Sequence, residues 1–214
     1  MNKPEVIVID YGVGNLLSVQ RGLEKCGAKV IVTSDRKIIL DGNRVVIPGV
    51  GAFSNAMKAL KDLELIEVLS ELAKRKIPLL GICLGMQLLL DESEEFGVTK
   101  GLGLIPGRVI PVPNQTNMGE KQKIPHIGWS SLQNSHSKSW SNTILQNNKP
   151  GDNAYFAHSF MAVPSNSNNL IAECNYGGIK IAAVIGKDQI TGCQFHPEKS
   201  GEVGLEILRD FCVD

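Results

Sequence analysis

The sequence predicts an α/β fold in which a mostly parallel central sheet is flanked by helices and carries an antiparallel β extension. Short β-branched runs alternate with helical patterns in the first half, which is typical of a parallel sheet covered on both faces. From Gly101 the runs become short and are separated by Gly, Asn, Ser and Pro, which favours antiparallel strands and hairpins. No repeat or linker divides the chain, so we expect one domain over residues 1–214.

The pattern of apolar and polar residues predicts the helices and strands along the chain. In the first half we expect a strand over Val6–Ile9, a helix over about Leu16–Cys26, strands over Lys29–Val32 and Val45–Ile47, a long helix near Ala52–Arg75, a strand over Pro78–Ile82 and a helix beginning at Leu84. In the second half we expect strands over Arg108–Pro113, Ala154–Ala162, Leu170–Asn175, Ile179–Gly186 and Ile190–Phe195, a helix from Gly201 to about Cys212, and polar surface loops over Asn114–Lys123 and Gln133–Pro150. Open α/β sheets keep their sites at the carboxyl ends of the parallel strands.

Charge and composition exclude several classes of protein. Lys plus Arg and Asp plus Glu are both 22, so no net field favours nucleic acid or an anionic membrane. The first apolar run is too short for a signal peptide, and no segment has the length of a membrane span. The five cysteines are scattered and odd in number, which indicates reduced thiols. We therefore expect a soluble, cytoplasmic protein.

Neither a metal site nor a nucleotide site is indicated. Cys193 and His196 are spaced like two metal ligands, but a second close pair is missing. The loop Asp10–Asn15 follows the first strand, but the third glycine of a dinucleotide fingerprint would fall at Leu17, and no Gly-Lys-Ser/Thr follows for a Walker loop. We interpret Asp10–Asn15 as a tight turn near the site, and we expect no cofactor.

The segment around Cys83 is an apolar strand, a turn with glycine two residues on either side of the cysteine, and an apolar helix. This is the pattern of a nucleophile elbow with sulfur in place of oxygen. Side chains at Gly81 and Gly85 would collide with neighbouring backbone, and the helix N-terminus favours a thiolate. The alternative interpretation is a buried core thiol, because free cysteine is among the most buried residue types.

A base for this nucleophile is available in the run from Gly192 to Glu198. Residues two apart in an extended segment face the same way, so Glu198 can lie beside the imidazole of His196 and fix its tautomer. Pro197 restricts the backbone between them. The alternatives are a satisfied core histidine and an ordinary turn. Since the other three histidines have no acidic residue within two positions, His196 is the candidate base.

Acyl transfer also needs hydrogen-bond donors for the developing oxyanion. In elbow folds one donor is the amide after the nucleophile, here Leu84, and another comes from a loop after a neighbouring strand. The loop Pro48–Gly51 follows such a strand, and its glycines leave it free to turn an amide inward. The alternative is an ordinary strand-to-helix turn.

Three motifs, Gly81–Gln87, Pro48–Gly51 and Phe195–Glu198, together resemble the triad glutamine amidotransferases over nearly the whole chain. Within that superfamily, further runs look like the glutaminase subunits of imidazole glycerol phosphate synthase. These runs are Ile9–Asn15, Ile124–Trp129, Tyr155–Phe160 and His196–Gly201.

This resemblance implies a catalytic triad of Cys83, His196 and Glu198, with the amides of Val50 and Leu84 holding the oxyanion. The Cys83 thiolate would attack the side-chain amide of L-glutamine, His196 would protonate the departing ammonia, and water would hydrolyse the thioester. The family pattern also places five groups at the glutamine, with Glu95 suited to its ammonium group. These are Gly51, Gln87, Glu95 and the backbone around Ser159 and Phe160.

The resemblance further implies a separate (β/α)₈ cyclase subunit that forms a heterodimer with this chain. Ammonia would pass through that barrel to a substrate that yields imidazole glycerol phosphate and AICAR in histidine biosynthesis. Family positions at this interface match Asn15, Trp129, Tyr155 and Lys199, which could otherwise be ordinary surface residues. Many relatives carry Asn where Ser130 stands and Tyr where Phe160 stands.

Three other functions remain open from the sequence. A paralogous glutaminase could supply ammonia for amination of a bacterial surface sugar with the same chemistry at Cys83. A free-standing γ-glutamyl thiol hydrolase would need no partner. A non-catalytic interaction module would leave glutamine uncleaved even with a cyclase present.

Overall fold

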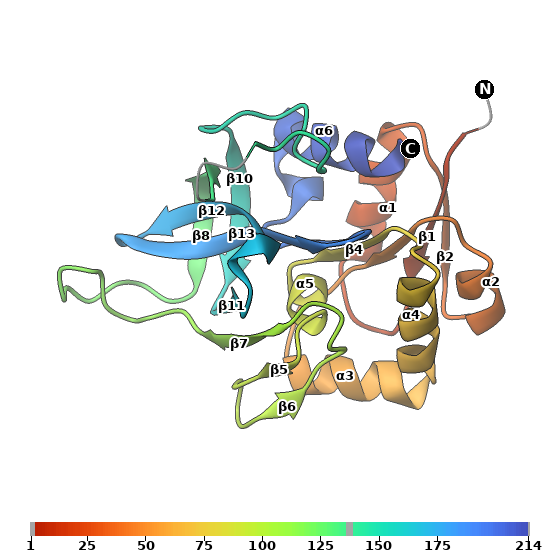
Figure 1. Ribbon diagram of the computed structural model, residues 1–214, viewed down its shortest axis with the longest axis horizontal. Coiled ribbons are helices and arrows are strands. Elements are labelled where there is room, and N and C mark those ends of the chain that lie inside the picture. Colours follow the sequence, from red (N-terminus) through yellow and green to blue (C-terminus); the bar gives the residue numbers. More distant parts are fainter. Residues whose placement is uncertain (1–2, 136–138, 214) are drawn as a thin grey trace.

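The computed structural model describes residues 3–135 and 139–213 and is built on one large sheet (Figure 1). The eight strands lie in the order β2 (Lys29–Thr33), β1 (Glu5–Ile9), β3 (Val45–Ile47), β4 (Leu79–Ile82), β14 (Ile190–Cys193), β13 (Ile179–Lys187), β12 (Leu170–Tyr176) and β9 (Gln133–Asn134). The first five of these strands are parallel, and β13, β12 and β9 continue the sheet in antiparallel pairs. The predicted fold class is confirmed.

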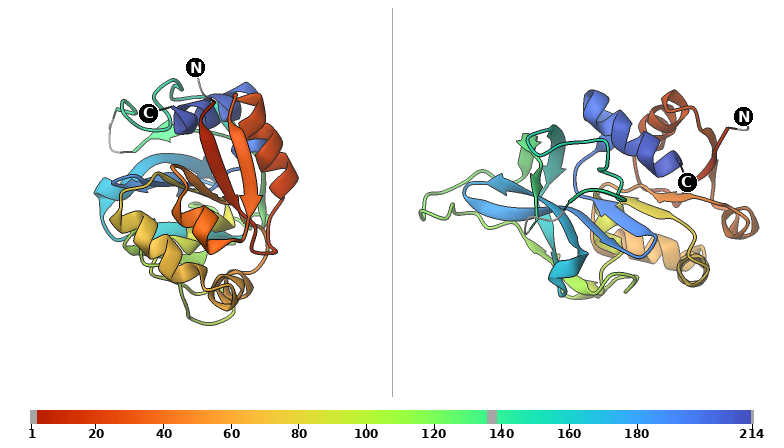
Figure 2. Two further views of the ribbon diagram at one scale, coloured as in Figure 1. Left: turned by 90° about the vertical axis from the view of Figure 1, so that its right-hand side faces the viewer. Right: turned by 45° about the horizontal axis from the view of Figure 1, so that its top comes forward.

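Helices cover both faces of the parallel strands, as the unbroken apolar runs predict (Figures 1 and 2). On one face, α1 (Leu16–Lys25) and α6 (Gly201–Cys212) pack over the core that contains Val6 and Val8. On the other face the core contains Ile7 and Ile9. That second layer consists of α2 (Arg36–Leu40), α3 (Phe53–Asp62), α4 (Leu65–Lys74) and α5 (Leu84–Leu88).

The single long helix expected near Ala52–Arg75 is wrong, because α3 and α4 are separate helices. Glu64 adopts a left-handed conformation with φ 56°, which ends the first helix and redirects the chain. The apolar pattern continues across this break and gave no sign of it. Helix α2 was not expected either; the Asp35 carboxylate begins it by accepting hydrogen bonds from the Lys37 and Ile38 amides.

Two smaller sheets lie beside the large one. One has the order β11 (Phe160–Pro164), β7 (Gly107–Pro111), β5 (Glu92–Ser93), β6 (Thr99–Lys100), and the other pairs β10 (Asn153–His158) with β8 (His126–Ser131). The run Ala154–Ala162 is therefore two strands that part at Ser159, where a single strand was expected. Short 3₁₀ turns η1 (Ser167–Asn169) and η2 (Pro197–Lys199) complete the chain.

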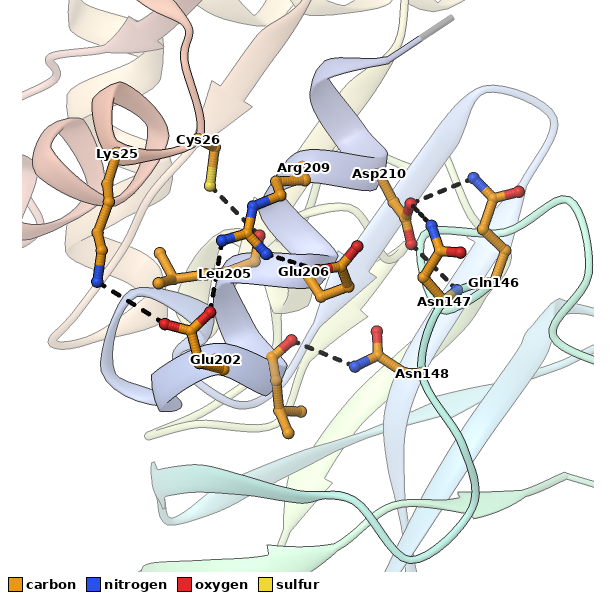
Figure 3. A network of polar contacts seen from close by, with 11 residues as sticks. Lys25, Cys26, Gln146, Asn147, Asn148, Glu202, Leu205, Glu206, Arg209 and Asp210 are labelled. Carbon is orange, nitrogen blue, oxygen red and sulfur yellow. Dashed lines mark hydrogen bonds and ion pairs between the residues drawn. The ribbon is translucent and has the colours of Figure 1, made fainter.

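The two expected surface loops differ from each other. Asn114–Lys123 is exposed and projects away from the body of the protein (green, far left of Figure 1), as predicted. Gln133–Pro150, of which residues 136–138 lie outside the described part, is in contrast anchored. Trp140 and Leu145 are buried, and Asp210 on α6 accepts hydrogen bonds from the side chains of Gln146 and Asn147 (Figure 3).

Candidate active site

Cys83 stands at the sharp turn between β4 and α5, with φ 54° and ψ −108°. Such a conformation costs about 1–3 kcal/mol and persists where the surroundings enforce it. A Cβ on Gly85 would lie 1.8 Å from the Ile47 carbonyl oxygen, and one on Gly81 would lie 2.6 Å from the Gly85 carbonyl oxygen. Both flanking glycines are therefore required by close backbone approach, which confirms the predicted elbow geometry.

The Cys83 thiol is largely buried, with 6% of the residue exposed, but its neighbours are polar. The side-chain amide of Gln194 donates to Sγ over 3.8 Å, and Sγ lies 4.0 Å from the Ala157 carbonyl oxygen. The Cys83 backbone amide is held by the Cys193 carbonyl at 2.8 Å. A thiol with a side-chain donor aimed at its sulfur differs from a core cysteine in apolar surroundings.

His196 and Glu198 lie together as their spacing predicts. His196 Nδ1 and Glu198 Oε1 are 2.9 Å apart, and their side chains are 5% and 1% exposed. The His196 backbone amide donates to the Tyr155 carbonyl, which fixes the start of η2. Glu198 Oε2 has no hydrogen-bond partner in the described part of the chain, so the carboxylate is compensated chiefly through His196.

The electrostatics favour a protonated imidazole. Burial lowers the pKa of His196, but hydrogen bonds with Cys83 and Glu198 and their charges outweigh it and raise the pKa to about 9. Since Nδ1 donates to Glu198, Nε2 is the ring nitrogen left for exchange of a proton with Cys83. The arrangement is suited to nucleophilic catalysis by the thiolate.

The loop Pro48–Gly51 lies beside the elbow, but it does not present the predicted oxyanion donors. The Leu84 amide donates to the Gly49 carbonyl over 3.4 Å. In a trans peptide the C=O and N–H point in opposite directions, so the Val50 amide of the same peptide is directed away from Leu84. The Tyr11 hydroxyl donates to the Pro48 carbonyl at 2.5 Å, so the loop Asp10–Asn15 does lie near the site.

The predicted glutamine-binding residues form two groups. The Gln87 side-chain amide is buried and donates to the Phe160 carbonyl at 3.0 Å, while the Ser159 carbonyl accepts from the Val112 amide. Glu95 accepts a hydrogen bond from the Phe53 amide at 2.5 Å, and this places its carboxylate at the start of α3, close in sequence to the exposed Gly51.

The predicted interface residues come from four elements. Trp129 on β8 is 58% exposed and lies opposite Tyr155 on β10, with ring centroids 5.9 Å apart in an edge-to-face arrangement. Asn15 is exposed and caps α1 through the Ser18 amide, and Lys199 is exposed on η2. The Tyr155 amide donates to the Ser200 hydroxyl just after η2, and the Tyr155 carbonyl accepts from the His196 amide, so hydrogen bonds join β10 to η2.

Three polar residues near the nucleophile were not predicted. Gln194 is completely buried, and it accepts from Gln87 while it donates to Cys83. His126 and His158 are buried 2.9 Å apart, ring nitrogen to ring nitrogen. A strand was expected over Ala154–Ala162 but none over His126–Ser131, so no sequence signal indicated the pairing that places His126 opposite His158.

Two absences apply to the part of the chain that the structure describes. No group of three or more His, Cys, Asp or Glu side chains there is arranged to hold a metal ion. Within the same residues, no helix has the length and apolar character that crossing a membrane requires.

Comparison with known proteins decides the family. The family model for glutamine amidotransferase class-I matches residues 7–214. The chain belongs to the class-I glutamine amidotransferases. It is thus an enzyme of the glutaminase type, and the fold described above is the fold of this family.

The similar curated relatives of this amidotransferase have one name in common. The chain is 49% identical to imidazole glycerol phosphate synthase subunit HisH 1 of Legionella pneumophila (strain Lens), over 96% of this chain and 97% of the relative. It is 43% identical to subunit HisH of Geobacillus sp. (strain WCH70), over 95% and 94%. It is 42% identical to subunit HisH of Geobacter sulfurreducens, over 97% of each.

Solved structures support the fold at lower identity. A structure titled glutamine amidotransferase has a TM-score of 0.72 at 13% identity, covering 97% of this chain and 99% of that one. PurLQS from Thermotoga maritima has a TM-score of 0.69 at 18% identity, covering 98% of each chain. These two likenesses concern the fold alone.

Proposed function

We propose that this amidotransferase hydrolyses L-glutamine to glutamate and ammonia, with Cys83 as nucleophile, His196 as acid and base, and Glu198 as the group that orients His196. The observation that carries this proposal is the 2.9 Å contact between His196 Nδ1 and the buried Glu198 carboxylate, next to a cysteine at an elbow. Such a set of nucleophile, base and orienting group is the constellation that acyl transfer requires.

The reaction follows from these positions. The Cys83 thiolate attacks the side-chain carbonyl carbon of glutamine, and the electron pair of the C=O bond moves to the oxygen. When the tetrahedral intermediate collapses, the C–N bond breaks, and protonated His196 gives its proton to the departing nitrogen. His196 then accepts a proton from water, whose oxygen attacks the thioester, and glutamate leaves as the sulfur is released.

We propose further that the ammonia is delivered to a separate (β/α)₈ cyclase subunit. The relatives named HisH are subunits of imidazole glycerol phosphate synthase, and at 42–49% identity over nearly the full length they support a shared reaction. The cyclase would combine the ammonia with N′-[(5′-phosphoribulosyl)formimino]-AICAR-phosphate to give imidazole glycerol phosphate and AICAR. Asn15, Trp129, Tyr155 and Lys199 would contact it.

Five free cysteines are in keeping with action in the reducing cytoplasm.

The oxyanion loop supports a role for that partner in activation. With the Gly49 carbonyl bonded to the Leu84 amide, one donor is occupied and the Val50 donor points away. Rotation of the Gly49–Val50 peptide by about half a turn would release the first donor and present the second. We propose that the cyclase and its ligand favour the rotated state, so that glutamine turnover is low in the isolated chain.

The test is co-purification with the cyclase subunit from the same genome, followed by two assays. Glutamate release is measured with and without the cyclase and its substrate, and imidazole glycerol phosphate is measured with glutamine as the nitrogen source. The proposal requires a stable complex, stimulated glutamate release and formation of product. Equal turnover with and without the cyclase would contradict activation, and a complex that makes no product from glutamine would contradict the assignment of the partner.

A further inference from the structure

The ribbon of β8 and β10 has two chemically different faces, both set by one strand register. His126 lies opposite His158, and Trp129 lies opposite Tyr155. Because side chains alternate along a strand, His126 and Ser130 share one face and Trp129 lies on the other. The exposed aromatic pair thus belongs to the same ribbon as two buried histidines.

The buried face carries a chain of short hydrogen bonds. Ser130 Oγ lies 2.9 Å from His126 Nε2, and His126 Nδ1 lies 2.9 Å from His158 Nε2. His158 Nδ1 lies 2.8 Å from the Phe160 carbonyl oxygen. The residues His126 and His158 are only 2% and 5% exposed, and the His126 ring is stacked against those of Phe156 and Tyr176.

The direction of this chain is fixed at its inner end. A backbone carbonyl can only accept, so His158 Nδ1 must carry the proton and His158 Nε2 must accept. His126 Nδ1 is then the donor to His158, and His126 Nε2 accepts from the Ser130 hydroxyl. Burial lowers the pKa of both imidazoles to about 4, so each ring is neutral at neutral pH and keeps one proton in one place.

The inner end meets a second chain that leads to the nucleophile. The Phe160 carbonyl also accepts from Gln87 Nε2 at 3.0 Å, so both of its lone pairs are used. The other proton of Gln87 Nε2 goes to Gln194 Oε1 at 3.0 Å, and Gln194 Nε2 donates to Cys83 Sγ at 3.8 Å. A continuous series of hydrogen bonds therefore joins Ser130 to the sulfur, with His158 and Gln87 both donating to the Phe160 carbonyl at its centre.

We propose that Ser130, His126 and His158 are positioning residues that hold the Phe160 carbonyl, and through it the Gln87 and Gln194 amides, in the arrangement that activates Cys83. The proposal rests on the proposed glutaminase function. A buried polar network is costly unless every member is satisfied, and a satisfied one specifies a single arrangement. Here that arrangement ends on the reacting atom, which distinguishes the network from polar groups that merely support the core.

We call the series of hydrogen bonds from Ser130 to the Phe160 carbonyl the relay. Ser130 is half-buried at its outer end, and its hydroxyl donates one hydrogen bond, to His126 Nε2. An asparagine at this position would also carry an N–H donor, whereas alanine would leave His126 Nε2 without one. The proposal therefore predicts that Ser130→Asn retains the relay and that Ser130→Ala breaks it.

The first test is the protonation of the rings in the isolated chain, measured by two-bond ¹H–¹⁵N correlation near pH 7. We expect His126 and His158 both to be neutral with the proton on Nδ1. Ser130→Ala should shift the His158 nitrogen signals although that ring lies two links away, and Ser130→Asn should restore them. Tyr176→Phe is the control, because it keeps the ring beside His126 and removes only a hydroxyl bonded to Lys123. A proton on Nε2 of either ring, or a His158 signal that Ser130→Ala does not move, would overturn the relay.

The second test compares two variants of His158. Asparagine keeps an N–H close to the position of Nδ1, so His158→Asn should still hold the Phe160 carbonyl, and His158→Leu should not. We expect the alkylation of Cys83 by iodoacetamide at fixed pH, and kcat for glutamine in the complex, to fall about tenfold in the leucine variant and less than about threefold in the asparagine variant. Synthesis from ammonium salts should be unchanged in both.

The outcomes separate the relay from the function on which it rests. Wild-type alkylation rates and kcat in a folded His158→Leu protein would overturn the relay and leave the glutaminase standing. If that variant does not fold, the comparison of Ser130→Ala with Ser130→Asn and the protonation of the two rings still decide whether the relay exists. A wild-type complex that never cleaves glutamine, with the predicted ring protonation and alkylation pattern, would instead overturn the proposed function.

Discussion

The Gly49 carbonyl oxygen accepts a hydrogen bond from the Leu84 amide over 3.4 Å, and this amide is one of the two donors that the proposed reaction assigns to the oxyanion. A carbonyl there repels a developing oxyanion. Cys83, His196 and Glu198 have the arrangement that the proposed reaction requires, but the proposed oxyanion site is closed by the protein's own backbone.

The Tyr11 hydroxyl restrains the closed loop through its bond to the Pro48 carbonyl. Tyr11→Phe should raise the unstimulated rate of glutamine hydrolysis several-fold, because the loop can then rotate more easily. It should also lower the free energy of unfolding by about 1–2 kcal/mol, since a buried carbonyl loses its donor. The measurements are glutamate release without the cyclase and urea unfolding. Tyr176→Phe, which removes a distant tyrosine hydroxyl, is the control, and an unstimulated rate no higher than that of wild type would contradict the restraint.

Glu198 should act through its charge. Glu198→Gln keeps the size of the side chain but removes the anion that raises the pKa of His196. We expect kcat for glutamine in the complex to fall by roughly 10²–10⁴-fold, as for loss of the carboxylate in other triads, with little change in KM. Glu206→Gln makes the same change of charge on the surface of α6 and should leave kcat as it is. A loss smaller than about threefold would remove Glu198 from the triad.

The buried histidines make the protein sensitive to acid. Burial lowers the pKa of His126 and His158 to about 4, and both titrate near 6.5 in the unfolded chain. Between these values the unfolded state binds more protons, so stability is lost as the pH falls from 6.5 towards 4. Urea unfolding at several pH values should show a loss of about 2–3 kcal/mol per ring by pH 4. His158→Asn should reduce the slope of the free energy of unfolding against pH by the equivalent of about one proton. An unchanged slope would contradict the lowered pKa of His158.

Trp129 is predicted to anchor the cyclase. It is 58% exposed and packs edge-to-face on Tyr155, so its side chain can be removed with little effect on folding. Trp129→Ala should weaken binding of the cyclase at least about thirtyfold, the loss typical of a central aromatic anchor. Titration calorimetry with Met118→Ala as the control tests this, because Met118 is 82% exposed on the loop Asn114–Lys123. Equal affinity of the two variants would place the interface elsewhere.

Local pattern was sufficient to predict the elbow at Cys83 and the pairing of His196 with Glu198. Gly81, Cys83 and Gly85 act within one turn, and the spacing of His196 and Glu198 fixes their pairing without knowledge of the rest of the fold. The strands that precede them, β4 and β14, are apolar runs, which is typical of buried strands in a parallel sheet. These features depend on neighbours in sequence, so the sequence was enough.

Other features of the fold and of the candidate site depend on strand register and on single backbone rotations, which the residue types do not determine. His126 and His158 meet because β8 and β10 pair in one register across 32 positions. Glu64 breaks α3 from α4 by a backbone conformation that its side chain does not signal. The orientation of the Gly49 carbonyl is a rotation of one peptide, which glycine permits in either sense. Long-range register and single peptide rotations were therefore found only in the structure.

Cys83 is proposed to make ammonia for a partner that can also use ammonia from solution. The most direct test is Cys83→Ala in the assembled complex with the cyclase, with product formation measured from glutamine and, separately, from an ammonium salt. We predict that synthesis from glutamine is abolished and that synthesis from ammonium is retained at the wild-type rate. Synthesis from glutamine that survives the substitution would contradict the account.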